Sequence, residues 1–369
     1  MSKSHYIIPI FVPHIGCPHD CVFCNQNTIT GKKRNIQVEE VTRDTTMRTI
    51  ESYLQTIDNS CNDKIIEVSF FGGTFTAIPI EKQMELLEVA YKYKCQGMIN
   101  FIRLSTRPDY IDIKELELLK KYGVDIIELG VQSLDEDVLK SSGRGHNSNV
   151  VEIASKLIKQ YNMTLGIQIM LGLPKDSFNK DINTAREVCR IKPDLCRIYP
   201  SLVIKDTPME TMFINGQYVP YTLEQAVEIC TFVYSMFVSE GIKVIRVGLQ
   251  PTEDINEGAE VVSGPFHPAF RELVESSLMN EMIFEELVNK EIKEIEIKIN
   301  PRNISKLYSN KKYYFNKFKH MCSNSKITVI QENALNMDEV EIKYEKQCKI
   351  MSMKKFMKEK SCKGNKIFL

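Results

Sequence analysis

Short apolar runs alternate with longer amphipathic segments along the first 250 residues of the chain. The runs expected to form strands are residues 6–12, 65–71, 99–105, 125–131, 164–171 and 195–199. The segments with helical periodicity are residues 38–57, 80–93, 113–121, 150–160 and 178–189. Continuously apolar strands that alternate with helices indicate a parallel sheet covered by helices. The pattern predicts an α/β fold, a partial (β/α)6 barrel, with its functional residues on the loops that follow the strands.

The rest of the chain departs from this rhythm. A helix is expected over residues 223–238, and another apolar run, 242–249, is expected to close or flank the barrel. Residues 251–268 indicate a long loop over the barrel mouth, followed by a helix over 269–280. The terminal part predicts a strand (294–299), a helix (304–308), a polar break (309–312), a helix (313–319) and two strands (326–331 and 339–344). We therefore expect a barrel over 1–250, an extension over 251–292, a small basic α+β module over 293–348 and a Lys-rich tail over 349–369.

Three cysteines, Cys17, Cys21 and Cys24, follow the first apolar run with the spacing C-x-x-x-C-x-x-C. Crowded soft sulfur ligands indicate disulfides or a metal, and an odd number without a secretory leader disfavours disulfides. A structural zinc site would need a fourth ligand, but no second Cys/His pair follows, and His19 inside the loop would be cramped. Three thiolates that hold a [4Fe–4S] cluster, with the fourth iron open to a substrate, explain both the number and the spacing.

This spacing, with Phe23 directly before the last cysteine, resembles that of the radical S-adenosylmethionine (radical SAM) enzymes. The resemblance implies that the open iron chelates the amino and carboxylate groups of SAM, and that an electron from the reduced cluster splits the sulfonium. The resulting 5′-deoxyadenosyl radical would abstract a hydrogen atom, while the protein positions the cofactors and excludes water. The resemblance also implies an electron donor such as flavodoxin or ferredoxin, and it adds Phe23 to the cofactor-binding residues.

Two strand ends resemble SAM-binding loops of this family. Gly72, Gly73 and Thr74 stand where the family has Gly-Gly-Glu, whose backbone holds the SAM amino group. Glycines allow close approach of a backbone to a ligand, although a tight turn alone explains the pair equally well. Ser105 and Thr106 end the third strand, where the family often places a group for the ribose or carboxylate. A capped turn is the alternative there.

The next two strand ends extend the resemblance. The sequence Gly-Val-Gln-Ser at 130–133 precedes Arg144, twelve residues after Gln132, as in oxygen-independent coproporphyrinogen oxidase and its relatives. The resemblance implies that Gln132 binds the ribose hydroxyls and that Arg144 binds the SAM carboxylate, for which a bidentate guanidinium is suited. Residues 166–174 end in Gly-Leu-Pro like the family's fifth strand, and Gln168 takes the place where relatives often carry an acidic ribose ligand.

The resemblance covers residues 6–280, and two stretches are closest to the radical SAM half of the Elongator catalytic subunit, which acts on tRNA wobble uridine. They are Ser-Thr-Arg-Pro-Asp at 105–109 and Gly-Pro-Phe-His-Pro-Ala-Phe-Arg at 264–271. The first two cysteines are closer together here, and the 89 residues after Asn280 are too few for that enzyme's acetyltransferase domain. The sequence thus resembles an Elongator-like radical SAM enzyme without the acyl-transfer half. A coproporphyrinogen-oxidase-like enzyme acting on a small molecule and a non-catalytic, metal-stabilised RNA-binding protein are the alternatives.

The charges are unevenly distributed, although their total is neutral. Of 48 basic and 48 acidic residues, sixteen and six lie from Pro301 to Leu369, which leaves 32 basic and 42 acidic residues before them. A basic module indicates an anionic partner, most commonly nucleic acid. Its order of elements resembles a KH-like RNA-binding fold, although the break at 309–312 lacks both glycines of the usual loop. A packing module with solvated lysines is the alternative, and the Elongator resemblance favours RNA, specifically tRNA, as the substrate.

The remaining composition is typical of a soluble cytoplasmic enzyme. No apolar stretch approaches the ~20 residues that span a bilayer, so no membrane association is expected. Eight further cysteines form no C-x-x-C pair and are expected to be reduced thiols. They are Cys61, Cys95, Cys189, Cys196, Cys230, Cys322, Cys348 and Cys362.

Overall fold

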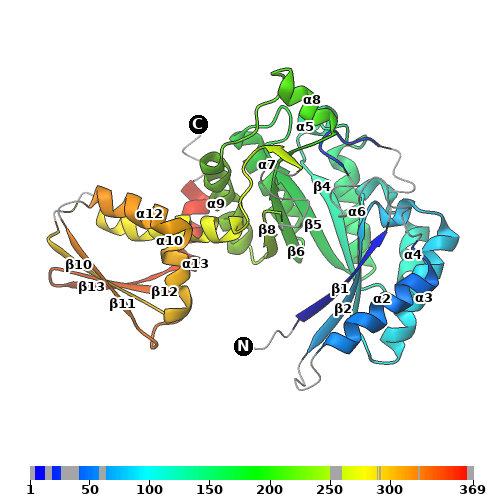
Figure 1. Ribbon diagram of the computed structural model, residues 1–369, viewed down its shortest axis with the longest axis horizontal. Coiled ribbons are helices and arrows are strands. Elements are labelled where there is room, and N and C mark those ends of the chain that lie inside the picture. The colour runs from blue at the N-terminus through cyan, green and yellow to red at the C-terminus, as the bar shows by residue number, and fades with distance from the viewer. Residues whose placement is uncertain are drawn as a thin grey trace.

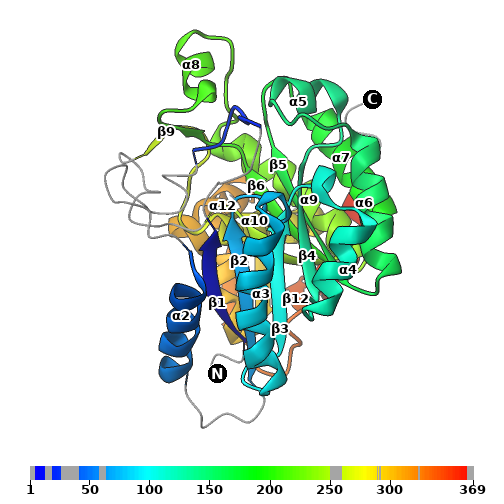
Figure 2. The ribbon, with the colours of Figure 1, turned by 90° about the vertical axis from the view of Figure 1, so that its right-hand side faces the viewer.

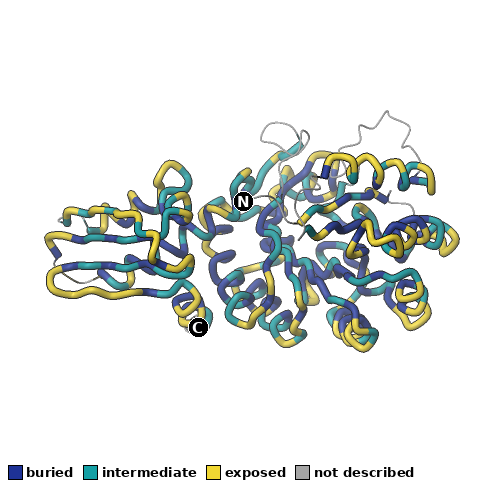
Figure 3. Tube along the Cα trace, turned by 90° about the horizontal axis from the view of Figure 1, so that it is seen from below, coloured by how far each residue is buried: buried dark blue, intermediate teal, exposed yellow. Residues whose placement is uncertain are grey.

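The computed structural model describes residues 5–12, 19–25, 41–57, 64–249, 260–288, 290, 292–322 and 325–363. Seven parallel strands form one curled sheet in the order β1-β2-β3-β4-β5-β6-β8 (Figures 1 and 3). The strands are β1 (His5–Val12), β2 (Ile65–Gly72), β3 (Phe101–Thr106), β4 (Ile126–Gln132), β5 (Thr164–Leu171), β6 (Leu195–Pro200) and β8 (Lys243–Val247). The α/β partial barrel predicted from the alternation is confirmed, and the run at 242–249 joins it as the seventh strand.

Helices cover the convex face of this sheet, and the strands form the buried inner arc in Figure 3. The helices are α2 (Arg43–Thr56), α3 (Ile80–Cys95), α4 (Ile113–Lys121), α6 (Ser148–Gln160), α7 (Phe178–Ile191) and α9 (Leu223–Ser239). Side-chain caps fix several of their starts, because the oxygens of Asp112, Asn147 and Ser177 accept the otherwise unpaired N–H groups of the first turn. On β1, Ile8 is buried on the helical side, whereas Ile7 is 40% exposed on the concave side.

The predicted strand ends differ from the observed ones by at most two residues, and β5 and α4 have the predicted bounds. The helix predicted over 38–57 begins at Arg43, after the Thr42 capping box, and residues 38–40 lie outside the described part. The short elements α5 (Glu136–Ser141), β7 (Val203–Ile204), α8 (Pro208–Ile214) and β9 (Val261–Ser263) are among those that were not predicted. Strands β7 and β9 pair with each other, so part of the segment expected to be a loop at 251–268 is a strand.

Charged side chains from four strands form a chain of ion pairs on the concave face, which we call the charge ladder. It consists of Glu67 of β2, Arg103 of β3, Glu128 of β4 and Arg197 of β6. Arg103 donates to Glu67 (2.8 Å) and to Glu128 (3.1 Å), and Arg197 donates to Glu128 (2.9 Å). Glu128 reaches β6 by passing over Gly166 of β5, where a Cβ atom would lie 2.7 Å from Glu128 Cγ. The ladder therefore links β2 to β6 across the inside of the half-barrel.

A four-stranded sheet with the order β11-β10-β12-β13 forms a separate C-terminal module (Figure 1). Its strands are β10 (Glu294–Ile299), β11 (Lys326–Gln331), β12 (Glu339–Tyr344) and β13 (Gln347–Ser352). Helices α10 (Phe270–Leu287), α11 (Ile304–Leu307) and α12 (Ser309–Met321) accompany it, and α10 ends well beyond the predicted residue 280. The predicted order of these elements along the chain, a strand, two helices separated by a break and then two strands, is confirmed. The break at 309–312 is a left-handed turn, with positive φ at Asn310, Lys311 and Lys312.

The segment expected as a Lys-rich tail, 349–369, is folded as far as it is described, up to residue 363. Strand β13 pairs with β12, and α13 (Met353–Lys363) packs against α9 and α10. Lys360 explains why a lysine-rich helix is held there: its ammonium group is buried, lies 2.5 Å from Glu281 and stacks 4.0 Å above the ring of Phe232. The division of the chain into four parts otherwise stays a prediction. None of the described helices is long and apolar enough to cross a membrane.

Candidate active site

The cysteine loop, residues 19–25, lies at the carboxyl-terminal edge of the sheet, near α5 and α8 (Figure 2). The N–H of Cys24 donates to the carbonyl of Cys21 (2.9 Å), so both cysteines belong to one tight turn. Cys21 is buried, and Cys24 is half-buried. The third predicted ligand, Cys17, lies outside the described residues. The described part of the loop thus brings two of the three predicted thiolate ligands together.

Two neighbouring segments hold the cysteine loop from opposite sides. The N–H of Val22 donates to the carbonyl of Ser142 at the end of α5 (3.1 Å), and the carbonyl of Val22 accepts from the N–H of Met209 in α8 (2.9 Å). The side chains of Val22 and Phe23 pack against a small apolar cluster of Val203, Met209 and Tyr218. Phe23, which was predicted to bind cofactor, therefore packs against α8 and the residues on either side of it. The sequence analysis did not predict this contact.

Two buried arginines converge on the sulfur of Cys21. Nη1 of Arg144 lies 3.2 Å from Cys21 Sγ, and Nη1 of Arg107 lies 3.8 Å from the same atom. Both side chains are 4% exposed. Arg144 also donates to the carbonyl of Gly130, and its buried Nε has no hydrogen-bond partner among the described residues. A buried donor without a partner is costly, so this nitrogen fits the role of an anion ligand.

A glycine allows the Arg144 loop to pack against the cysteine loop. Gly145 has φ +73°, and a Cβ atom there would lie 2.3 Å from the ring of His19. The next residue, His146, is surrounded by protein and lies near the Arg144 cation. Burial, reinforced by that positive charge, lowers the pKa of His146 to about 4. His146 is therefore neutral at pH 7 and does not compete with Arg144 for an anion.

The predicted glycine loop follows β2 and contacts the end of β1. Gly72 has φ +109°, and a Cβ atom there would lie 2.4 Å from the carbonyl oxygen of Val12. The N–H of Gly73 donates to this same oxygen (3.2 Å), and Thr74 is buried. Close packing of the two strand ends therefore requires Gly72 independently of any ligand. The predicted SAM-binding role of Gly72, Gly73 and Thr74 stays a prediction.

The predicted ribose ligands lie beside one another. Gln132 ends β4 in a bulge with φ +69°, and its side-chain oxygen accepts a hydrogen bond from Gln168 Nε2 (3.3 Å). Ser105 is half-buried, in register with Glu128 of the charge ladder. Thr106 points to the other side, where its hydroxyl is buried and lies 2.5 Å from that of Thr76. Thr106 is therefore a core residue, and Ser105 is the better candidate of the two.

The sequence analysis missed Arg107, Asp109 and the charge ladder. Residues 105–109 were interpreted only as a family signature or a capped turn, yet Arg107 is buried beside Cys21 and forms a bidentate pair with Asp109 (2.9 and 2.8 Å). Burial raises the pKa of Asp109, but the hydrogen bonds and charge of Arg107 outweigh it, so this pKa is lowered overall. The ladder residues were hidden because they alternate with apolar ones inside strands. A charged residue within an apolar strand is the signal that would have found them.

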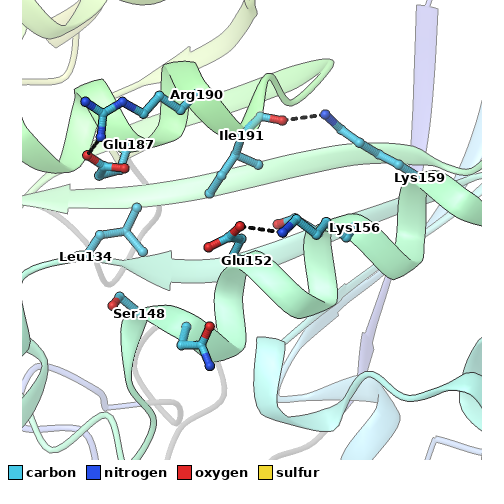
Figure 4. A pocket seen from close by; sticks show the side chains of 10 residues that line it. Leu134, Ser148, Glu152, Lys156, Lys159, Glu187, Arg190 and Ile191 are labelled. Atoms are coloured by element: carbon cyan, nitrogen blue, oxygen red, sulfur yellow. Dashed lines mark hydrogen bonds and ion pairs between the residues drawn. The ribbon is translucent and has the colours of Figure 1, made fainter.

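A groove of about 640 Å³ on the outer surface, between α6 and α7, is not part of this site (Figure 4). Its charged side chains are already paired: Lys156 with Glu152 (2.5 Å), and Arg190 with Glu187. Lys159 donates to the carbonyl of Ile191. With these charges satisfied by one another, the groove offers little to an ionic ligand.

Two family models match adjoining parts of the chain. The model of the radical SAM superfamily matches residues 11–188, and that of the radical SAM C-terminal domain matches residues 193–280. The two matches together contain every described site residue discussed above, and the first also contains Cys17.

Curated relatives are similar to the same region. A tRNA uridine(34) acetyltransferase of Methanocaldococcus infernus is 29% identical over 267 residues, which is 62% of this chain and 49% of that protein. Elongator complex protein 3 of Homo sapiens is 28% identical over 276 residues, 64% of this chain and 49% of that protein. The chain thus spans about half the length of these relatives. Among solved structures, the archaeal Elp3 of Methanocaldococcus infernus matches with a TM-score of 0.57 at 23% identity, over 76% of this chain and 63% of that one.

Proposed function

Because the chain belongs to the radical SAM superfamily, and is therefore an enzyme, we propose that it binds one [4Fe–4S] cluster through Cys17, Cys21 and Cys24 and cleaves SAM with it. The observation that carries this proposal is the cysteine turn at the mouth of the barrel, with the buried Arg144 guanidinium directed at Cys21. Cluster and SAM together supply one-electron radical chemistry when bound. An electron donor such as flavodoxin or ferredoxin would have to reach this mouth, and we place the reaction in the cytoplasm.

The chain's own residues would orient SAM around the mouth. Arg144 would bind its carboxylate, because the guanidinium is buried and its Nε lacks a partner among the described residues. The adjacent amides of Gln132 and Gln168 would hold the ribose hydroxyls, and Ser105 is the next polar side chain along the concave face. The backbone at Gly72, Gly73 and Thr74 would receive the amino group, and Phe23 would shield the cluster beside α8.

Replacement of Arg144 by alanine should weaken SAM binding about 30–150-fold. The loss of a charge-assisted bidentate pair costs about 2–3 kcal/mol. Equilibrium dialysis of SAM against anaerobic protein, normalised to iron content, measures the effect. We expect the iron content to change less, because Arg107 still contacts Cys21. Arg190→Ala, a surface arginine paired with Glu187, is the matched control. Unchanged SAM affinity in Arg144→Ala would assign the carboxylate to another residue.

We further propose that the second substrate is tRNA. The matched relatives have names that refer to tRNA uridine 34 or to Elongator, and this chain carries a basic C-terminal module. On the sheet of that module the lysines are paired, for example Lys298 and Lys343 with Glu341. Seven exposed lysines of the module that take part in none of the ion pairs found among the described residues lie on α12 and α13, and both helices pack against α10. They are Lys311, Lys312, Lys317, Lys319, Lys354, Lys355 and Lys358.

The helix α12 is the best candidate for contact with RNA. Tyr313 is 45% exposed directly beside Lys312, and an aromatic ring among cations is a combination that binds single-stranded bases and phosphates. Truncation after Asn300 is a poor test, because it would also remove α13 and uncover α9. Substitution of surface lysines leaves this packing in place.

The triple variant Lys311→Gln, Lys317→Gln, Lys319→Gln should bind tRNA more weakly and with less dependence on salt. On a single strand, each lost phosphate contact reduces the magnitude of the slope of log affinity against log salt concentration by about 0.7. The loss of three contacts should therefore reduce this slope by about 2. Filter binding or fluorescence anisotropy over a salt series measures both quantities. A control variant with the same charge change is Lys114→Gln, Lys120→Gln, Lys121→Gln on α4, on the outer side of the barrel. Equal losses in the two variants would contradict a specific role of α12.

The decisive experiment is mass spectrometry of total tRNA nucleosides from a deletion strain beside its parent. We expect one modified nucleoside to disappear, and 5′-deoxyadenosine to form when the reduced protein is incubated with SAM. Altered porphyrins with an unchanged nucleoside profile would instead support the coproporphyrinogen-oxidase-like function. An absence of 5′-deoxyadenosine would contradict the proposed cleavage of SAM.

A further inference from the structure

We propose that Arg107 is a positioning residue that sets the reduction potential of the cluster through the sulfur of Cys21. This inference rests on the proposed cluster. Arg107 directly follows β3, far from the cysteine loop in sequence, yet its Nη1 lies 3.8 Å from Cys21 Sγ and its side chain is 4% exposed. Because a guanidinium stays protonated in proteins, a fixed positive charge faces this ligand at any working pH.

The sequence Arg107-Pro108-Asp109 holds this side chain in one orientation. A residue before proline is restricted to extended backbone, and Arg107 has φ −88° and ψ 150°. Asp109 then accepts from Nε (2.9 Å) and Nη2 (2.8 Å), which leaves the opposite edge of the guanidinium turned toward Cys21. Nη2 also donates to the carbonyl of Arg144. Three separate contacts therefore fix the direction of Nη1.

The two arginines beside Cys21 have different tasks. Arg144 has a buried Nε without a described partner, so it has bonding capacity left for a ligand. Arg107 donates through Nε and Nη2 to Asp109 and the carbonyl of Arg144, and its Nη1 lies beside the sulfur of Cys21. The side chain of Asp109 is 19% exposed and that of Arg107 only 4%, so water screens the carboxylate more than the cation. The net field at Cys21 is therefore positive.

A positive charge and an N–H donor at a cluster thiolate favour the reduced cluster. Reduction adds one negative charge, which the nearby cation stabilises, and hydrogen bonds to cluster sulfurs are among the factors that set the potential of iron–sulfur centres. Arg107 would thus make the cluster easier to reduce by the electron donor. It would do so without touching SAM or the second substrate.

The test compares midpoint potentials of the full chain, reconstituted anaerobically without SAM and titrated with monitoring by electron paramagnetic resonance. For Arg107→Gln we expect the ratio of reduced to oxidised cluster at a fixed potential to fall about tenfold, which corresponds to ~59 mV for one electron. Arg107→Lys keeps the charge but loses the planar fork, so its ratio should fall less. Arg190→Gln, at the surface, should match the wild type.

An Arg107→Gln protein with about four irons and the wild-type potential would overturn the inference and leave the proposed cluster intact. A wild-type protein that binds no cluster would instead overturn the proposed function. If the Arg107→Gln protein does not retain its iron, the midpoint potential of Arg107→Lys is compared with that of the wild type instead. A lower potential in Arg107→Lys supports the inference, and an unchanged potential contradicts it. Thermal melting of each variant separates this effect from a general loss of stability, which would not by itself shift the potential.

Discussion

Alanine at Cys17, Cys21 and Cys24 together should abolish iron binding by the chain. The wild-type protein, reconstituted anaerobically, is expected to hold about four irons per chain. It should show an absorption band at about 400 nm that dithionite bleaches. Cys21 and Cys24 share one turn, so their sulfurs can bind the same cluster. Because a cluster with one open iron already has only three protein ligands, the triple variant leaves it none from this loop.

The matched control replaces three cysteines that are exposed and distant from the loop, Cys95, Cys348 and Cys362. This variant should retain the iron content and the absorption of the wild type. Iron determination and visible spectra of both variants, prepared side by side, provide the measurement. A triple variant of the loop cysteines that still holds four irons would refute the cluster assignment.

Glu128→Ala should lower the free energy of unfolding by about 3–5 kcal/mol, the range for removal of one partner of a buried ion pair. Glu128 is the acceptor for two arginines, Arg103 and Arg197, at 3.1 and 2.9 Å. Arg103 is 4% exposed, and among the described residues it would retain the carboxylate of Glu67 as its ion-pair partner. The substitution leaves Arg197 with its cation–π contact to Phe71 and a hydrogen bond to Tyr199.

Urea unfolding followed by circular dichroism measures this change. The matched control is Glu152→Ala, whose partner Lys156 lies on the exposed side of α6, and a surface pair of this kind contributes about 0.3–0.5 kcal/mol. Glu128→Gln keeps the shape and part of the hydrogen bonding of the side chain. Its loss in free energy of unfolding should therefore lie between those of Glu128→Ala and Glu152→Ala. A loss below about 1 kcal/mol in Glu128→Ala would mean that water compensates the two arginines and that the ladder contributes little to stability.

Most of the barrel could be predicted because its signals are local. Strand β5 and helix α4 have the predicted bounds, since an apolar run and an Asp112 cap mark them directly in the sequence. Helix α8 could not be predicted, because a seven-residue helix has too little periodicity to stand out. Its role in holding Val22 and Phe23 depends on contacts made across about 190 residues of chain.

The candidate site shows the same limit. The cysteine spacing and the positions of Gln132, Gln168 and Arg144 could be recognised as motifs. In the structure, Arg144 and Gln132 lie beside Gly130, and Gln168 donates a hydrogen bond to Gln132. The contact between Arg107 and Cys21 was not predictable, because nothing local distinguishes a buried arginine from one that caps a turn. Likewise, the lysines of residues 349–363 did not indicate a packed helix, which the contacts of Lys360 with Glu281 and Phe232 show.

The position of α13 has a consequence for how the protein is made. The face of α9 that carries Phe232 is covered by a helix that the ribosome synthesises late. The ~130 residues from Phe232 to Lys360 take roughly 6–25 s to translate at ~5–20 residues per second. During that interval an apolar strip of the nascent barrel faces water. We therefore expect ribosome stalling in this interval to promote aggregation of the nascent chain, because α9 is not yet covered by α13.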